Sequence, residues 1–398
     1  MGKSFKIVVG IFLICLFLLS FSCSKGDSSS EVSQVAGDST VLVQEPVTVT
    51  IWHNRGPGAN LDSLLRAIDK FNATNTLGIT VTEEYVGGYA VVLTKTLTSI
   101  AAGNNPVLVL QHGAGLATLA SKGALTDLTP FIERDSYDLN NFIESLMCYS
   151  YDNNQVISLP YIPSTAVLYY NKGLLEEAGV EVPTTMEELE VAAKEIHAKT
   201  GKFGCSFYIS ADYIQDAWLH SLGGAGIIDD DNGLTSLDNG SLAYLLDTWA
   251  RWIDEGWCQA PKVTSQQSAM QQSFQTGEAA MMILSSGGIA DAILNAQDAG
   301  QDVDVAYMPG FGKLATNIGG GNLAIVGMNH SEQEIAAAWE FMKFITADEQ
   351  VADNHVTTGY LPTTFSSIET DSIKQFWDEN PGYKVAFEQL EWANAVSF

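Results

Sequence analysis

The sequence predicts an α/β fold with more than one domain, and three observations lead to this prediction. Short β-forming runs alternate with segments of helical periodicity, as in parallel sheets covered by helices. The 398 residues suffice for two or three domains of roughly 150 residues each. The composition, 46% hydrophobic and only 17% charged, is that of a globular protein rather than a disordered one.

The chain opens with the pattern of a secretory signal peptide. Lys3 and Lys6 precede an apolar run over residues 7–19. As a helix this run would be only about 20 Å long, which is too short for a bilayer core of about 30 Å. A basic start followed by a short apolar run is typical of a cleaved leader.

The residues after this run resemble a bacterial lipoprotein box, with the sequence Leu19-Ser20-Phe21-Ser22-Cys23. In such a box the signal peptide, here residues 1–22, is removed and the new N-terminal cysteine, here Cys23, is acylated. The alternative is an ordinary secretory peptide cut nearby, which would leave Cys23 as a plain thiol. Residues 23–45 are rich in Ser, Gly, Asp and Glu without apolar periodicity, so we expect a flexible tether.

The first elements of the mature chain alternate strand, helix and strand. Residues 47–51 alternate apolar and polar β-forming side chains, which predicts a strand. Apolar residues then recur at helical spacing from Leu61 to Phe71, with Asn60 as the expected N-cap. The next predicted elements are a strand at 79–81, a helix over 93–100 that closes near Gly103, and a strand at 107–110.

A second set of elements begins after a stretch with two prolines, residues 151–163, which we interpret as a crossing between lobes. It passes into a β-rich segment at 166–170. Thr185 and Glu188 form a capping-box pattern for a helix that ends at Gly201. The remaining predicted helices cover 242–253 and the segment that opens with the capping-box pattern of Ser331 and Glu334.

Charge and cysteine content exclude several classes of function. The 19 basic and 47 acidic residues give a formal net charge of −28, which repels polyanions, so we expect no nucleic-acid partner. After residue 23 the cysteines are Cys148, Cys205 and Cys258, widely spaced and without a C-x-x-C motif. We therefore expect no metal site and no cofactor. One disulfide with a leftover thiol and three buried thiols both fit this pattern.

The sequence also lacks the motifs of several enzyme classes. It contains no G-x-S-x-G elbow, no H-E-x-x-H helix and no P-loop, and its Gly319 run lacks the strand and helix context of a dinucleotide site. We therefore expect no enzymatic activity. Two alternatives stay open: a carbohydrate-active secreted enzyme, which needs only a suitably spaced pair of carboxyls, and a surface lipoprotein that contacts other proteins.

Seven short motifs follow one another along the mature chain: Ile51-Trp52-His53, Tyr85-Val86-Gly87-Gly88-Tyr89, Ala102-Gly103-Asn104-Asn105-Pro106, residues 163–172, residues 274–281, Ile318-Gly319-Gly320-Gly321 and Thr358-Gly359-Tyr360-Leu361-Pro362. In order and spacing they resemble the extracellular solute-binding proteins (family 1) of ABC importers. The similarity is greatest to the glycerol-3-phosphate and sugar-binding branch and covers nearly the whole chain from Val47.

The resemblance implies a fold as well as a function. It implies a periplasmic-binding-protein-like fold of type II, in which two α/β lobes close on a ligand in the cleft between them. Lobe 1 would comprise residues 46–160 plus 311–359. Lobe 2 would comprise residues 161–310 plus 360–398.

The resemblance also implies ligand-binding residues. It carries over two pocket tyrosines, two serine hydroxyls, one glycine N–H and one cleft tryptophan, here Tyr89, Tyr360, Ser164, Ser286, Gly320 and Trp218. The alternative for the aromatic residues is an ordinary place in the core, and for the serines and the glycine a role in turns.

Departures from the branch bear on the ligand. Gly113 stands where the branch has a glutamate, with His112 beside it, and Asn322 stands where a small hydroxyl residue is expected. We expect His112 and Asn322 to bind the ligand as well. No arginine follows Arg251, so the guanidinium that would bind a phosphate is missing. This favours a neutral sugar or polyol, unless the chain is truncated at its C-terminus.

We therefore expect a substrate-binding lipoprotein. It would capture a sugar, polyol or glycerol-3-phosphate-type solute and deliver it to the membrane permease of an ABC transporter. We expect a monomer in the bacterial cell envelope, lipid-anchored at the outer face of the cytoplasmic membrane or in the periplasm.

Overall fold

The structure is a computed structural model, and it describes residues 46–208, 212–224, 226, 227, 233, 235–261 and 266–394. The predicted signal peptide (1–22), the lipid-attachment residue Cys23 and the tether up to residue 45 lie outside the described residues. Within the described ranges, every helix is too short or too polar to span a bilayer.

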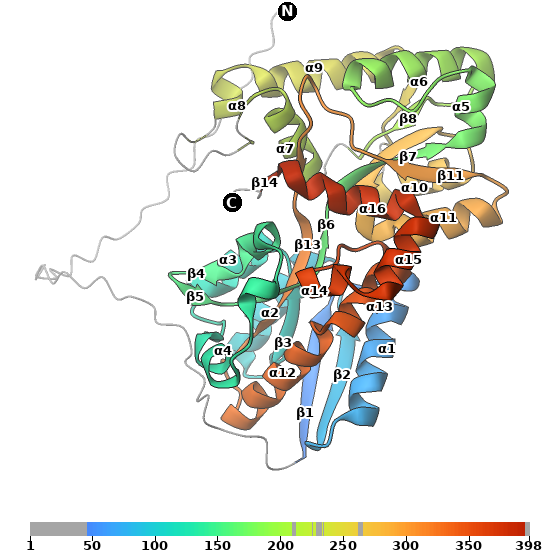
Figure 1. The fold of residues 1–398 in the computed structure, drawn as a ribbon. Helices are drawn as coiled ribbons and strands as arrows, with labels where there is room; N and C mark the ends of the chain where they lie inside the picture. Colours follow the sequence, from blue (N-terminus) through green and yellow to red (C-terminus); the bar gives the residue numbers. More distant parts are fainter. Residues whose placement is uncertain are drawn as a thin grey trace, which may run out of the picture. The chain divides into compact units, whose positions relative to one another are not determined.

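Five strands form the first sheet, in the spatial order β2-β1-β3-β13-β6 (Figure 1). The strands are β1 (Val47–His53), β2 (Ile79–Tyr85), β3 (Leu108–Gln111), β6 (Leu159–Ser164) and β13 (Gly319–Ile325). β1 is parallel to β2 and β3, whereas β13 is antiparallel to β3 and β6. The strands predicted at 47–51, 79–81 and 107–110 are therefore confirmed as neighbours in one sheet.

Helices cover both faces of this sheet: α1 (Ala59–Thr74), α2 (Tyr89–Ala102), α3 (Gly113–Ser121), α4 (Thr129–Asp135) and α12 (Glu332–Ile345). In β3, Leu108 and Leu110 enter the core shared with α1, α4 and α12, whereas Val109 enters the core shared with α2 and α3. Side chains of a strand alternate between faces, so a strand covered on both sides is apolar throughout. The short hairpin of β4 (Tyr151–Asp152) and β5 (Gln155–Val156) precedes β6.

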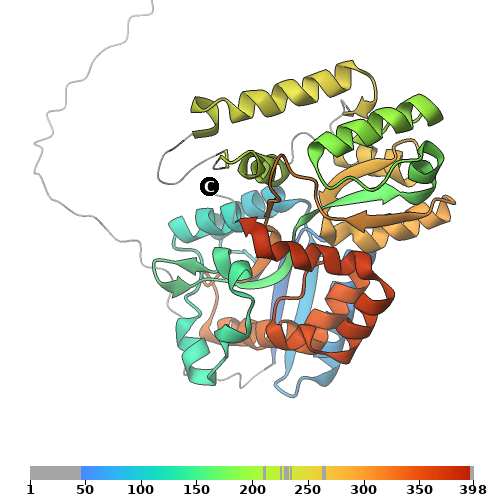
Figure 2. The same cartoon turned by 45° about the horizontal axis from the view of Figure 1, so that its top comes forward.

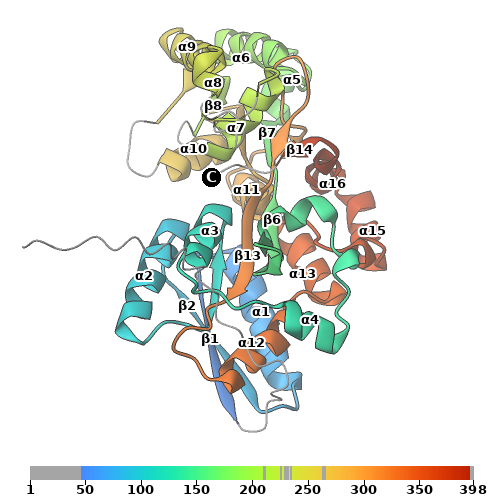
Figure 3. The same cartoon turned by 90° about the vertical axis from the view of Figure 1, so that its left-hand side faces the viewer.

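Five further strands form the second sheet, in the order β11-β7-β10-β8-β9. The strands are β7 (Ala166–Asn171), β8 (Cys205–Ser206), β9 (Cys258–Gln259), β10 (Met281–Ser285) and β11 (Val303–Ala306). The chain passes from the first sheet to the second at Thr165, between β6 and β7, and returns before β13 (Figure 3). A small parallel pair, β12 (Thr316–Asn317) and β14 (Ala393–Asn394), lies outside both sheets.

The second sheet is also covered on both faces. Its helices are α5 (Lys172–Ala178), α6 (Met186–Thr200), α7 (Asp212–Ser221), α8 (Thr235–Asp238), α9 (Ser241–Asp254), α10 (Gln266–Gln275) and α11 (Ile289–Asp298). In β7, Ala166 and Leu168 enter a core with α5, α6, α7 and α9, whereas Val167 and Tyr169 face α10 and α11.

Four helices lie between α12 and β14: α13 (Asp348–Thr358), α14 (Phe365–Ile368), α15 (Asp371–Glu379) and α16 (Pro381–Glu388). They are the orange-red to red helices of Figure 2. Ile373 and Ala386 join the core that contains α10 and α11. α15 and α16 therefore pack against the second sheet, whereas α13 packs against α1, which covers the first sheet.

Local signals in the sequence agree with the observed helix ends. The capping boxes predicted at Thr185 and Ser331 are present, with both reciprocal hydrogen bonds. The helices predicted to close at Gly103 and Gly201 do so, with both glycines in the left-handed conformation.

The predicted cap of α1 is wrong. Asn60 lies inside the helix, and the N-cap is Gly58, which has no side chain to accept a hydrogen bond. The carboxylate of Asp291, on α11, accepts the Ala59 N–H instead (3.1 Å). A side chain more than 200 residues away in the sequence therefore supplies the cap.

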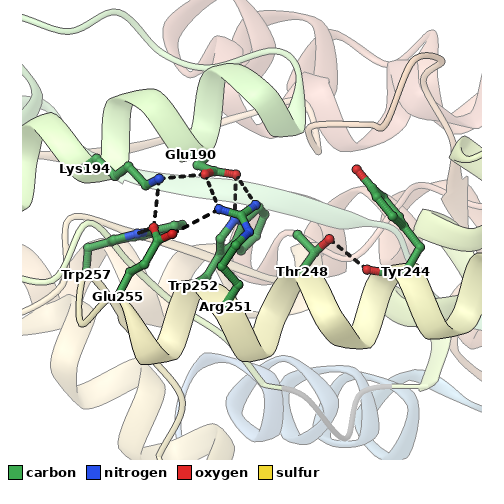
Figure 4. Close-up of polar contacts among 8 residues, drawn as sticks. All are labelled: Glu190, Lys194, Tyr244, Thr248, Arg251, Trp252, Glu255 and Trp257. Carbon is green, nitrogen blue, oxygen red and sulfur yellow. Dashed lines mark hydrogen bonds and ion pairs between the residues drawn. The ribbon is translucent and has the colours of Figure 1, made fainter.

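A polar network joins α6 to α9 (Figure 4). Glu190 on α6 accepts hydrogen bonds from Arg251 Nη2 (2.8 Å) and Trp252 Nε1 (2.7 Å) on α9. Lys194 pairs with both Glu190 and Glu255. The Arg251 guanidinium is the main reason that the pKa of Glu190 is lowered to about 2.

The three cysteines of the described residues are free thiols. Cys205 and Cys258 occupy paired positions of β8 and β9 and are buried, whereas Cys148 is exposed. Of the two patterns that the sequence left open, the structure therefore has neither a disulfide nor three buried thiols.

Candidate functional site

A cavity of about 570 Å³ has walls from the elements of both sheets. Its lining residues are Asn54, Gly88, Tyr89, His112, Gly113, Tyr149, Ser164, Tyr208, Tyr213, Gln267, Leu284, Ser285, Ile318, Gly319, Gly320 and Tyr360. Five of these are tyrosines, and among the described residues no Asp, Glu, Lys or Arg lines the cavity. The lining is therefore uncharged and rich in hydroxyl and N–H donors.

A second hollow, of about 560 Å³, lies along α6 and is lined by residues 180–184, 187, 188, 191 and 192. Its walls come from one continuous stretch of chain. It brings together no groups from distant parts of the sequence, so we take the cavity between the sheets as the candidate site.

The cavity lies where strands of both sheets end. Asn54 follows β1, His112 follows β3, and Ser285 is the last residue of β10. In α/β folds, ligands commonly bind beyond the carboxyl ends of the strands, because loops there carry side chains from several elements to one place.

His112 and Tyr89 form one wall. The His112 Nδ1 atom accepts the Gly115 N–H (3.0 Å) and so caps α3, while its ring stacks on that of Tyr89 at a centroid distance of 4.9 Å. Gln111 donates to the Tyr89 carbonyl (3.1 Å) and packs so tightly on Gly115 that a Cβ there would collide with it. Burial raises the pKa of Tyr89, so its phenol is neutral.

Tyr360 contributes a second wall. The carbonyl of Tyr360 accepts a hydrogen bond from His355 Nδ1 (2.7 Å), and its ring packs against Gly287 so closely that a Cβ at Gly287 would collide with it. Burial raises the pKa of Tyr360 too. Its backbone and ring are thus held in place by α13 and by the segment after β10.

Two glycines of β13 complete the lining. Gly320 has φ +89, a conformation that other residues rarely adopt, and a Cβ there would collide with the Ile162 carbonyl of β6. Gly319 lies opposite Ser164 in the same pair of strands. Their small size brings the backbone to the cavity surface, where N–H groups can meet a ligand.

Five of the predicted ligand-binding residues line the cavity, namely Tyr89, His112, Ser164, Gly320 and Tyr360. Trp218 does not: it is 1% exposed, packs edge-on against Phe207 and Trp249, and donates to the Pro309 carbonyl (3.1 Å). Its large apolar ring is held in the core of the second sheet.

Asn322 and Ser286 also lie outside the lining. Asn322 is buried and donates to the hydroxyls of Ser150 (3.2 Å) and Ser158 (3.0 Å), so its amide joins β13 to the segments on either side of the β4–β5 hairpin. Ser286 is fully buried in the turn after β10, and its neighbour Ser285 lines the cavity instead.

Sequence reasoning missed Asn54, Tyr149, Tyr208, Tyr213, Gln267 and Ser285. Asn54 lies three residues beyond the strand predicted at 47–51, and that position was a usable signal, because loops at the carboxyl ends of strands carry ligand-binding residues. Tyr213 and Gln267 reach the cavity from α7 and α10, and no local motif marks such residues.

Three comparisons with known proteins agree with this architecture. The model of the family described as bacterial extracellular solute-binding protein matches residues 66–384. The chain is 25% identical over 350 residues to the sn-glycerol-3-phosphate-binding periplasmic protein UgpB of Rhizobium meliloti, covering 85% of this chain and 80% of that protein. The UgpB protein of Brucella melitensis is 26% identical over 353 residues, with the same coverage.

Solved structures show the same fold. UgpB from Mycobacterium tuberculosis, in complex with glycerophosphocholine, superposes with a TM-score of 0.80 at 23% identity and 88% coverage of both chains. The GacH receptor of Streptomyces glaucescens GLA.O gives a TM-score of 0.75 at 24% identity, with 88% and 87% coverage. The predicted α/β, periplasmic-binding-protein-like fold is confirmed. Since the family model spans most of the sequence, the chain belongs to the bacterial extracellular solute-binding protein family.

Proposed function

We propose that this protein captures a small polar solute, of the sugar or glycerophosphate type, in the cavity between its sheets and delivers it to the permease of an ABC importer. The observation that carries the proposal is the composition of the cavity, whose walls offer tyrosine and serine hydroxyls and glycine N–H groups and, among the described residues, no Asp, Glu, Lys or Arg side chain. Such a lining binds oxygen-rich molecules by hydrogen bonds.

Capture depends on contacts that the solute makes only when the walls of the cavity are close together. A solute that touches Tyr89 on α2 and Ser285 on β10 at the same time bonds to elements of both sheets. Such a solute stabilises the arrangement in which the walls are close, because only there are both sets of contacts made. The permease then distinguishes the loaded protein from the empty one by this arrangement.

The names of the relatives support the solute class. Two UgpB proteins are named for sn-glycerol 3-phosphate, and the structural neighbours contain glycerophosphocholine or acarbose. We further propose that acylated Cys23 anchors the protein in the bacterial envelope, with residues 23–45 as the tether, and that it acts as a monomer.

We do not propose that the protein converts the solute chemically. A glycoside hydrolase needs two carboxyl groups on either side of the scissile bond, and among the described residues no carboxyl group lines the cavity. The hydroxyls of Tyr89 and Tyr360 are neutral phenols whose pKa values are raised by burial, which makes them hydrogen-bond donors rather than bases.

The test is a binding measurement by isothermal titration calorimetry with sn-glycerol 3-phosphate and maltose, alongside native mass spectrometry of the gently purified protein. Tyr360→Phe removes one cavity hydroxyl and should weaken binding by about 1–3 kcal/mol, because its partner on the solute is left unpaired. Tyr151→Phe, at an exposed tyrosine outside the cavity, is the matched control. Unchanged affinity in Tyr360→Phe, or the absence of any bound or titrated solute, would contradict the proposal.

A further inference from the structure

Arg55 is a buried cation beside the cavity. It is 2% exposed and directly follows Asn54, which lines the cavity. Its guanidinium carbon lies 5.4 Å from the ring centroid of Tyr360 and 5.3 Å from that of Tyr161. Tyr360 therefore contacts the guanidinium and also forms part of the cavity wall.

The hydrogen-bond partners of this guanidinium are neutral. Nη1 donates to the Tyr161 hydroxyl (2.8 Å), Nη2 donates to Asn354 Oδ1 (2.9 Å), and the buried Nε has no partner. No carboxylate of the described residues forms an ion pair with it, in contrast to the arginines on the surface. Arginine is always charged in proteins, so Arg55 is a buried positive charge without a counter-ion among the described residues.

The carboxylates that influence the neighbouring tyrosines are bound to other groups. Asp353 acts on Tyr161 but pairs with Arg66 at the surface (2.9 Å). Asp291 acts on Tyr360 but accepts the N–H of Ala59. An unpaired buried charge is unfavourable, and an anion beside it would relieve that cost.

The field of Arg55 reaches the cavity wall. Burial raises the pKa values of Tyr89 and Tyr360, and in both cases the charge of Arg55 acts in the opposite direction. These two tyrosines line the cavity, together with Ser164 and Gly320. Arg55 therefore adds a positive charge behind a wall that offers hydroxyl and N–H donors, and among the described residues no carboxylate that would repel an anion lines the cavity.

We propose that Arg55 is the specificity-determining residue for charge, and that it selects a solute that carries a phosphate group. The inference rests on the proposed function, because it requires the cavity to hold a solute. It also replaces the expectation of a neutral ligand, which followed from the lack of an arginine after Arg251. In the folded chain a guanidinium comes from the end of β1 instead. Arg55 lies behind Tyr360, so it acts on the solute through its electric field and not by direct contact.

Titration calorimetry with sn-glycerol 3-phosphate, inorganic phosphate and maltose tests this proposal on the intact protein. The attraction between two opposite unit charges roughly 8 Å apart, at an effective dielectric constant of about 20, changes a dissociation constant by roughly 30-fold. We expect Arg55→Met to weaken binding of sn-glycerol 3-phosphate by about this factor, and Arg55→Lys, which keeps the charge, to retain most of the affinity. Arg251→Met, at a surface arginine of α9, is the control and should bind like the wild type.

The outcomes separate this inference from the proposed function. Two results overturn the role of Arg55 and leave solute capture standing. One is a wild type that binds maltose but neither phosphate probe. The other is an Arg55→Met protein that binds sn-glycerol 3-phosphate like the wild type. Binding of no probe contradicts both. If Arg55→Met does not fold by circular dichroism, Arg55→Lys decides: it must bind sn-glycerol 3-phosphate in preference to maltose, as the wild type does, and loss of that preference overturns the role of Arg55.

Discussion

Acidification should destabilise the protein through His355, the residue that holds the backbone of Tyr360. His355 is fully buried, and its Nε2 atom accepts a hydrogen bond from Trp377 Nε1 (2.7 Å). An indole N–H only donates, so the proton of the neutral imidazole is on Nδ1, which donates to the Tyr360 carbonyl (2.7 Å). Burial lowers the pKa of His355 from 6.5 to about 4.

The direction and size of the effect follow from proton linkage. In the unfolded chain His355 takes up a proton near pH 6.5, whereas the folded protein resists protonation until about pH 4. The stability that this group contributes is therefore complete above pH 6.5 and is lost as the pH falls from 6.5 to about 4. Each pKa unit corresponds to about 1.4 kcal/mol, so the total loss is about 3 kcal/mol.

Urea unfolding followed by tryptophan fluorescence, at a series of pH values from 7.5 to 4, measures this loss. His355→Gln removes the titrating ring, so its free energy of unfolding should fall less steeply with decreasing pH than that of the wild type. The difference in slope should reach about 1.4 kcal/mol per pH unit. The matched control is His197→Gln, because His197 makes the same kind of bond, from Nδ1 to the carbonyl five residues on (2.8 Å), but is only half-buried.

Equal slopes for the wild type and His355→Gln between pH 6.5 and 4 would refute the reasoning, whatever the absolute stability of the variant. A control variant that flattened the slope as much as His355→Gln would do so as well, because the effect would then not depend on burial.

Two further predictions concern contacts between distant segments. Asp291→Ala should lower the free energy of unfolding by about 1 kcal/mol, because α1 loses the carboxylate that caps the Ala59 N–H; Asp298→Ala, at an exposed position of α11, is its control, and equal melting temperatures of the two variants would contradict the prediction. Glu190→Gln should cost about 1–2 kcal/mol at neutral pH, because Arg251 and Lys194 each lose one of their two carboxylate partners. That cost should disappear as the pH falls from 4.5 toward 2, since the pKa of Glu190 is lowered to about 2 in the folded state; a cost that is independent of pH in urea unfolding would exclude this cause.

Helix ends and strands were predictable where the signal is local. Thr185 and Ser331 cap their helices through residues three positions away, and Gly103 ends α2 because glycine adopts the left-handed conformation without strain. The cap of α1 was not predictable in this way. Gly58 has no side chain to offer, and the group that replaces it comes from α11.

The candidate site, too, was predictable only where the signal is local. Tyr89 follows Gly87-Gly88 and Tyr360 follows Gly359, and both tyrosines line the cavity. Trp218 has the chemistry of a ligand-stacking residue, yet its surroundings are Phe207 and Trp249, so it belongs to the core. Whether an aromatic ring faces a core or a cavity depends on which distant segments pack around it.

The sequence by itself determined the α/β alternation, the helix ends that have local caps and the resemblance to solute-binding proteins, because each depends on residues close together along the chain. The tertiary structure alone decided which side chains share the cavity and that Arg55 is buried beside Tyr360. Arg55 hydrogen-bonds Asn354, 299 residues away. The physical reason is that burial and electrostatic fields act over distances of a few ångströms in space, and only folding brings such segments that close.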